Sequence, residues 1–159
     1  MPLTDERSTL LEYLRAYRLT LGMKCEGLDA EQLALRSVPP STMSLLGLVR
    51  HMADVERHWF RRVMAGDPAP KIYRPEGAAW EGAIGDADVV AEAWGSWRTE
   101  VTFADELVER TDDLGSTGQL LDGDPIQLRE VLVHMIEEYA RHCGHADLLR
   151  ERIDGRTGQ

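Results

Sequence analysis

The chain has 159 residues, of which 28 are acidic and 18 basic, for a formal net charge of −10 at pH 7. Its length suits one domain, and its 43% hydrophobic and 29% charged content excludes disordered and fibrous proteins. The acidic balance argues against nucleic acid and anionic membranes as partners, because both select basic surfaces. No run approaches the roughly 20 apolar residues of a membrane span, and the start MPLTDERSTL is too charged for a signal peptide, so we expect a cytoplasmic protein.

The first predicted helix covers residues 5–27, because apolar residues recur along it at the spacing of one helical face. These residues are Leu10, Leu14, Tyr17 and Leu21. A short extra turn is expected next, since Asp29 with Gln32 three residues later forms a capping pattern. The double proline of SVPPST then separates this part from the second helix.

The second predicted helix covers residues 44–66, with Ser44 as its N-cap and Gly66 at its end. Its apolar row is Leu45, Leu48, Met52, Val55 and Trp59. Residues 67–86 are rich in proline and glycine and show no period, which predicts a long crossover loop packed down by Tyr73 and Trp80.

The third helix is predicted from apolar residues at alternating spacings of four and three, which is typical of a bundle seam. They are Val90, Trp94, Trp97, Val101, Ala104 and Val108. A loop at 111–124 leads to the fourth helix, for which we predict Asp124 as N-cap and Pro125 as first residue, with an end at Gly155. The pattern predicts an all-α fold, a four-helix bundle with long crossover connections, and one domain over residues 1–159.

The last helix places polar residues on its inward face, in the stretch EEYARHCGHADLLRERIDG. Glu138 and His142 are four residues apart, so their side chains can converge in front of the helix. His51 lies on or beside the apolar row of the second helix and can complete the set. Two imidazoles and a carboxylate match an open zinc site with one position left for water or substrate.

Other interpretations of these residues remain open at this stage. An inward histidine beside an inward glutamate also fits a simple ion pair at a bundle end. His58 or His134 can replace a member of the set, and His145 fits a supporting partner or an acid/base residue that faces substrate. Among these we predict His145 as the catalytic residue.

Several well-known sites are excluded by spacing. Di-iron bundles need Glu-x-x-His pairs on two helices, and the second helix offers none. HExxH, GxSxG, P-loop and GxGxxG motifs are absent. Cys25 and Cys143 form no spaced pair, so we expect free thiols rather than a disulfide or a thiolate zinc site.

The stretches SLLGLVRHMADVERHWF and EEYARHCGHADLLRERIDG together resemble the DinB/YfiT-like metalloprotein superfamily, in its branch of actinobacterial domains of unknown function. The resemblance covers nearly the whole chain. It implies a divalent metal held by one histidine of the second helix and an H-x-x-x-H pair of the last, here His51, Glu138 and His142. Glu138 stands where most members have histidine, as in the variant of the mycothiol-dependent maleylpyruvate isomerase.

The resemblance implies a thiol-dependent S-transferase or isomerase of the mycothiol type that acts on a small molecule. Zinc is the first expectation for the metal, with nickel or iron as alternatives, and a homodimer is expected. Tyr73, Arg74 and Trp80 of the crossover are candidates for substrate recognition. The competing hypotheses are a metal-dependent hydrolase that uses the same site, and a non-catalytic stress-response or binding module.

Overall fold

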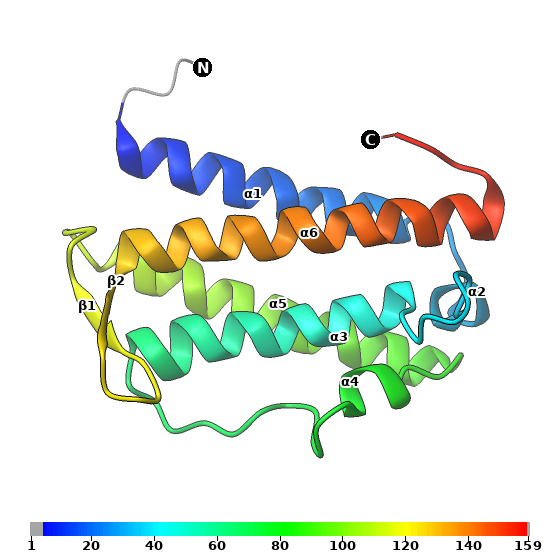
Figure 1. The fold of residues 1–159 in the computed structure, drawn as a ribbon, viewed down its shortest axis with the longest axis horizontal. Coiled ribbons are helices and arrows are strands. Elements are labelled where there is room, and N and C mark those ends of the chain that lie inside the picture. The colour runs from blue at the N-terminus through cyan, green and yellow to red at the C-terminus, as the bar shows by residue number, and fades with distance from the viewer. Residues whose placement is uncertain (1–4, 159) are drawn as a thin grey trace.

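The computed structural model describes residues 5–158, which fold as a four-helix bundle (Figure 1). The long helices are α1 (Glu6–Cys25), α3 (Leu45–Glu56) with its π-helical continuation η1 (Arg57–Met64), α5 (Ala87–Glu109) and α6 (Leu128–Asp154). Figure 1 shows α1 beside α6 and α3 beside α5, with the first and last helices running opposite to the middle two. The all-α bundle predicted from the sequence is confirmed.

The long connections follow from the directions of the helices. The helices α3 and α5 pack side by side and run in the same direction. Residues 65–86, which connect the end of η1 to the start of α5, must therefore run back along the length of the bundle. This crossover contains the short helix α4 (Ala78–Glu81), and α2 (Ala30–Ala34) lies between α1 and α3. Within residues 5–158, no helix is long and apolar enough to cross a membrane.

Local sequence signals give three of the helix ends as predicted. Asp29 and Gln32 form a reciprocal capping box at α2. The Ser44 hydroxyl accepts a hydrogen bond from the Gly47 N–H at 3.0 Å and caps α3. Gly155 ends α6 with φ of +78°, a left-handed conformation that favours glycine.

The connection between α5 and α6 contains a β-hairpin where a loop was predicted. Strand β1 (Thr117–Gln119) pairs antiparallel with β2 (Pro125–Gln127). The hairpin packs on η1 so closely that a Cβ on Gly118 would lie 2.4 Å from the carbonyl oxygen of Val63. Strands of three residues are too short to show an alternating pattern, which is why the sequence did not reveal them.

The predicted start of the last helix was wrong. Asp124 does not cap it and Pro125 is not its first residue, since α6 begins at Leu128. Gln127 is the N-cap and forms a capping box with Glu130. Pairing with β1 keeps the residues of β2 extended up to Gln127. The backbone carbonyls of Ser116 and Leu114, which lie just before β1, accept hydrogen bonds from the N–H groups of Leu128 and Arg129 at the start of α6.

The core lies between the four long helices. Its largest fully buried side chains include Tyr139, Phe60, Leu14, Leu21, Leu45, Leu46, Leu48, Met52, Leu128, Leu132 and Met135. The predicted seam of α5 needs one correction, because Glu100 is 1% exposed while its neighbour Val101 is only partly buried. Cys25 and Cys143 are free, as expected, and both are buried.

Candidate metal centre

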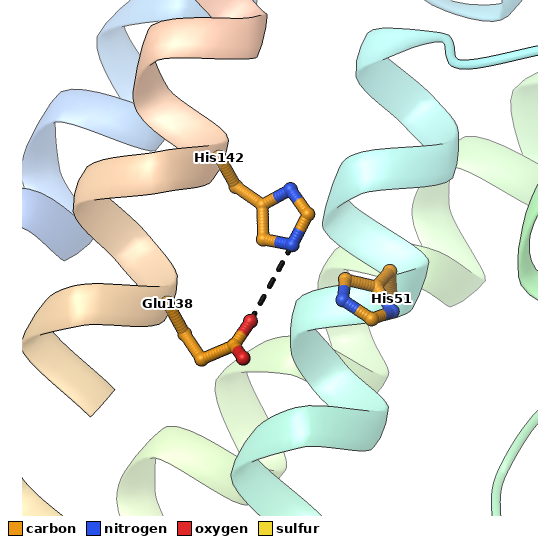
Figure 2. A group of neighbouring side chains, drawn as sticks. All are labelled: His51, Glu138 and His142. Atoms are coloured by element: carbon orange, nitrogen blue, oxygen red, sulfur yellow. Dashed lines mark ion pairs between the residues drawn. The ribbon is translucent and has the colours of Figure 1, made fainter. Parts of the chain in front are cut away.

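Three side chains converge in the seam between α3 and α6 (Figure 2). His51 comes from α3, and Glu138 and His142 come from adjacent turns of α6. Each offers one ligand atom, and these atoms all lie within 4.8 Å of one another. Within residues 5–158, no other group of three or more His, Cys, Asp or Glu side chains converges in this way.

The packing of the two helices produces this convergence. Met52 beside His51 and Tyr139 beside Glu138 are both 0% exposed, so each helix is held firmly against its neighbours. His142 Nε2 lies 3.5 Å from Glu138 Oε2, and the rings of His51 and His142 meet edge to face at 4.7 Å between centroids. The three residues predicted as ligands are therefore brought together.

The electrostatic environment leaves both imidazoles uncharged at neutral pH. Burial lowers the pKa of His51 to about 4, with smaller contributions from His142 and Lys71. Burial also lowers the pKa of His142, although the Glu138 carboxylate partly opposes this shift. Neutral imidazole is the form that ligates a metal, whereas an ion pair with Glu138 would require imidazolium.

The donor set fits a divalent cation. Two histidine nitrogens and one carboxylate oxygen form the ligand set of open zinc sites, in which two ligand atoms on one ion lie at most roughly 4 Å apart. The observed spread of up to 4.8 Å needs only a small approach of the side chains. With a cation bound, the Glu138 carboxylate would face a positive charge, whereas without one it lies partly buried beside two neutral imidazole rings.

Two further histidines on α6 support this set from outside it. His134 Nε2 lies 3.4 Å from Glu138 Oε1, and its ring lies against Trp59 with centroids 4.5 Å apart. His145 Nδ1 lies 3.2 Å from His142 Nδ1. Such contacts fix the orientation of ligand side chains, which is the usual role of groups behind a metal ligand.

A cavity of about 360 Å³ opens beside His51. Its lining residues come from α3, η1, the crossover and the tip of the hairpin, and they include His58, Trp59, Arg62, Tyr73 and Trp80. His145 is not among the lining residues, whereas His58 is. The volume is typical of a site for a small molecule.

The aromatic residues predicted in the crossover take different places. The Trp80 indole stacks on the His51 ring with centroids 5.2 Å apart. Tyr73 is buried, donates its hydroxyl hydrogen bond to Glu92 at 3.0 Å and also lines the cavity. Arg74 is exposed and lies outside the cavity lining, so its predicted contact with substrate finds no support.

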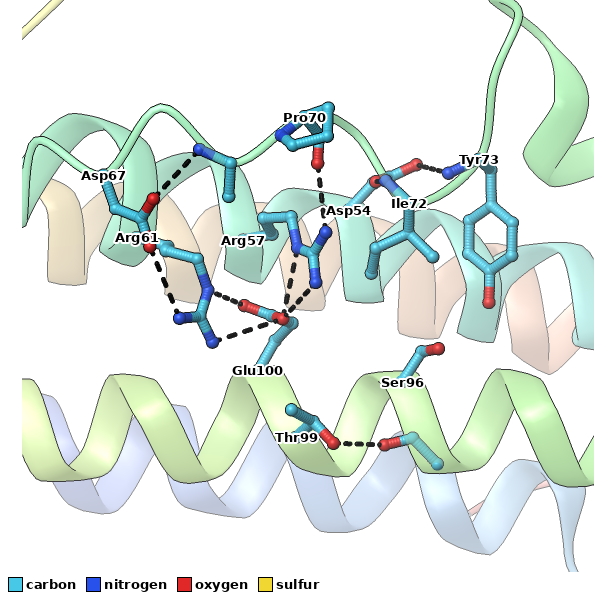
Figure 3. A network of polar contacts seen from close by, with 12 residues as sticks. Asp54, Arg57, Arg61, Asp67, Pro70, Ile72, Tyr73, Ser96, Thr99 and Glu100 are labelled. Carbon is cyan, nitrogen blue, oxygen red and sulfur yellow. Dashed lines mark hydrogen bonds and ion pairs between the residues drawn. The ribbon is translucent and has the colours of Figure 1, made fainter.

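Polar contacts fasten the crossover along α3 and η1 (Figure 3). Asp54 accepts hydrogen bonds from the backbone N–H groups of Ile72 and Tyr73, at 2.7 and 3.4 Å. Arg57 donates to the carbonyl oxygen of Pro70 at 3.0 Å. These contacts hold the backbone that carries one wall of the cavity.

Glu100 of α5 contacts the arginines of η1 that lie under the crossover, as Figure 3 shows. Its carboxylate is almost fully buried and accepts hydrogen bonds from Arg57 at 2.8 and 3.1 Å and from Arg61 at 2.9 Å. A buried carboxylate is stable only when charged partners compensate it, and here two arginines do so. Glu100 thereby links α5 to the wall of the cavity.

The sequence interpretation missed Glu100 and Arg62. Glu100 lies three residues after Trp97 and four before Ala104, so the helical period marked it as inward, but its charge argued for the surface. Arg62 had no such signal. It reaches the cavity from η1, whose π-helical winding is not foreseen by a period of 3.6 residues.

Comparison with known proteins gives two matches. The sequence model of the family described as Mycothiol-S-transferase matches residues 9–155. The crystal structure of a conserved protein from Enterococcus faecalis superposes with a TM-score of 0.54 at 16% identity, covering 95% of this chain and 96% of that one, which supports the fold alone. No curated protein matches the chain.

Proposed function

Because the chain belongs to the mycothiol S-transferase family, a DinB/YfiT-like family, we propose that it transfers a small cofactor thiol to an electrophile at a metal site formed by His51, Glu138 and His142. The observation that carries this proposal is the convergence of the three ligand atoms within 4.8 Å at the edge of a cavity of small-molecule size. The family match supports a thiol of the mycothiol type as the cofactor.

A divalent metal at this site, with zinc expected first and nickel or iron as alternatives, would lower the pKa of a bound thiol and so favour its nucleophilic thiolate. His51 and His142 contribute uncharged nitrogen donors, and Glu138 contributes the carboxylate. His134 and His145 orient Glu138 and His142 through the contacts described above. The catalytic role predicted for His145 stays a prediction.

The proposed transfer balances without an oxidant or reductant. The thiolate sulfur forms a bond to the electrophilic carbon, the leaving group departs with its bonding electron pair, and the thiol proton passes to solvent. Trp80 covers one face of the His51 ring and thereby limits the access of water to it. The cavity beside His51 would hold the electrophile.

The test is the metal content of protein purified without a chelator or an affinity tag. We expect near one equivalent in the wild type and loss in Glu138→Ala and His142→Ala. Glu137→Ala is the matched control, because Glu137 precedes Glu138 on the same helix but points to solvent with 57% of its side chain exposed. Wild-type protein without metal would contradict the proposal.

A cobalt-substituted protein then distinguishes thiol chemistry from hydrolysis. If the site binds a thiol, addition of mycothiol changes the visible absorption of cobalt, and esters and amides leave it unchanged. Transfer of the thiol to a fluorogenic alkyl halide should accompany the spectral change. A response to esters alone would favour a metal-dependent hydrolase.

We also propose that the protein is a homodimer. A groove of about 770 Å³ between α1 and α5 is lined by charged and apolar side chains, and the apolar ones include Leu11, Val101 and Leu19, the last with 64% exposed. Light scattering should give the mass of a dimer, and Leu19→Glu should yield a monomer. Leu148→Glu is the control, because Leu148 is exposed on α6 outside the groove.

A further inference from the structure

Arg62 of η1 is an unusual arginine for this chain. It is partly buried and lines the cavity beside His51, yet within residues 5–158 no carboxylate or carbonyl oxygen accepts a hydrogen bond from its guanidinium. The more deeply buried arginines all have such acceptors, namely Arg18 with Glu56, Arg50 with Ala79 and Arg150 with Asp154. No guanidinium nitrogen of Arg62 is buried without a partner, so these nitrogens stay accessible to a ligand that accepts hydrogen bonds.

The three other charged side chains of the cavity each have a partner. Lys71 is paired with Glu76 at 2.7 Å, and Asp54 accepts hydrogen bonds from two backbone N–H groups of the crossover. Burial, together with the charge of Arg62, lowers the pKa of His58, so this ring adds no charge at neutral pH. Of the four charged side chains that line the cavity, Arg62 is therefore the one without a hydrogen bond or ion pair among the described residues.

The remaining lining suits a flat apolar body. Trp59 and Trp80 contribute indole rings, and the volume of about 360 Å³ admits a small molecule rather than a polymer. A guanidinium binds a carboxylate through two parallel hydrogen bonds, the geometry for which arginine is best suited. A small aromatic or apolar molecule with a carboxylate fits both features.

The distance between Arg62 and His51 limits where the carboxylate sits on that molecule. The two residues are eleven apart, at most roughly 16.5 Å along a helix at about 1.5 Å per residue. Side chains of a helix lean toward its N-terminus, and because the arginine side chain is longer than that of histidine, the gap between the two side-chain ends is shorter than the separation along the axis. A molecule that spans it carries its carboxylate several bonds from the carbon next to His51.

We infer that the electrophile of this protein is a small aromatic or apolar carboxylate, held at Arg62 by its carboxylate and presented to His51 by its opposite end. Naming this ligand as the electrophile rests on the proposed function. The binding of a carboxylate at Arg62 does not, since it requires neither metal nor thiol. A para-substituted benzoate has the required shape, with the carboxylate at one end and the reactive carbon at the other.

The experiment is a titration of the whole chain with 4-methylbenzoate and with 4-methylbenzamide, followed by tryptophan fluorescence and calorimetry. Trp59 and Trp80 report directly on the cavity that they line. Wild type should bind the acid at least tenfold more tightly than the amide. Arg62→Gln should lose this preference and Arg62→Lys should keep part of it, while Arg74→Gln, which removes an exposed arginine outside the cavity, should bind like wild type.

Equal affinities for acid and amide in the wild type, or an undiminished preference in a folded Arg62→Gln protein, would overturn the inference. Thermal unfolding of each variant shows that it is folded. The proposed function has its own test, since it is contradicted if the protein contains no metal or transfers no thiol. A metal-loaded transferase without preference for the acid would refute only the inference, and a metal-free protein that binds the acid through Arg62 would refute only the proposed function.

Discussion

Two polar clusters lie close together where α3 packs against α6, and they differ in how their groups are satisfied. In the first, Glu56 is 0% exposed and accepts two hydrogen bonds from Arg18, both at 2.8 Å. The Tyr139 hydroxyl donates to Glu56 at 2.7 Å and accepts from the indole N–H of Trp97 at 2.8 Å. This cluster, which we call the closed cluster, consists of Arg18, Glu56, Trp97 and Tyr139.

The second cluster, which we call the open cluster, consists of His51, Glu138 and His142. Its ligand atoms converge, but the one contact between them within ion-pair range is 3.5 Å long and joins Glu138 to an imidazole whose pKa is lowered. Tyr139 directly follows Glu138 on α6. Because successive side chains of a helix point about 100° apart, the Tyr139 side chain belongs to the closed cluster and the Glu138 side chain to the open cluster.

The difference shows how buried polar groups reveal their role. In the closed cluster each charge has an opposite charge, so the cluster needs nothing from outside and serves the fold. In the open cluster two neutral imidazoles and a carboxylate converge on one point with no positive charge among them, so a cation there would stabilise the arrangement.

The largest effect is expected from the closed cluster. Glu56→Ala leaves Arg18 buried without its main partner, and the loss of one member of a buried pair costs about 3–5 kcal/mol of unfolding free energy. Urea denaturation should measure this loss in the metal-free protein. Asp105→Ala is the control, because Asp105 also contacts Arg18 but is 65% exposed, and it should cost less than about 1 kcal/mol. Equal costs would mean that the cluster is not closed as described.

The open cluster should respond to metal instead. A cation at 100 times its Kd should raise the unfolding free energy by about 2.7 kcal/mol if it binds the folded state alone, and a chelator should remove this gain. Thermal unfolding with zinc and with EDTA measures it. His142→Ala should abolish the gain and leave the metal-free stability close to that of wild type. A gain that persists in His142→Ala would place the metal elsewhere.

Acidification should also affect the open cluster. The folded state holds the pKa of His51 at about 4, whereas an unfolded chain protonates histidine near pH 6.5. The unfolded state therefore binds more protons below pH 6.5, and stability falls as the pH drops from 6.5 toward 4. Between pH 7 and 5 the contribution of His51 is about 2 kcal/mol.

The measurement is the change in unfolding free energy of metal-free protein between pH 7 and pH 5, for wild type and His51→Asn. The variant should lose about 2 kcal/mol less over this interval. An NMR titration of the imidazole resonances gives the pKa directly. A His51 midpoint near 6.5 would show that the ring is solvated and would remove the electrostatic argument for a metal ligand.

The sequence was sufficient for the open cluster and insufficient for the closed one. Glu138 and His142 stand one turn apart on an otherwise apolar face, and His51 lies beside the apolar row of its own helix, so helical periodicity indicated that the three can converge, and the resemblance to the DinB/YfiT-like superfamily pointed to the same set. Glu56 and Arg18 lie on different helices at positions where charges normally face solvent. Their pairing depends on how α1 and α3 pack, which no local pattern encodes.

The same distinction applies to the fold. Helix starts at Asp29 and Ser44 depend on contacts within four residues and were predictable. The start of α6 depends on pairing between Gly118 and Ile126 in the hairpin, and on hydrogen bonds from the first N–H groups of α6 to backbone carbonyls just before β1. The local N-cap signal at Asp124 therefore gave the wrong residue. Contacts that are distant in sequence therefore decided where α6 begins.

The smallest effect is expected from a substitution that tests whether Trp80 is packed tightly against His51 of the open cluster. An alanine Cβ at position 47 in α3 would lie 2.7 Å from Cε3 of Trp80, the indole that stacks on His51. Glycine to alanine within a helix normally stabilises by about 0.5–1 kcal/mol, and Gly95→Ala in α5, where nothing lies within 4 Å of the new Cβ, should do so. Gly47→Ala should instead destabilise by about 1 kcal/mol, because the overpacking cost exceeds the helical gain. It should also shift the tryptophan fluorescence as Trp80 leaves His51, while metal content stays near that of wild type. A stabilised Gly47→Ala protein would show that the indole moves freely, and the wall over His51 would then be a mobile cover rather than a packed part of the bundle.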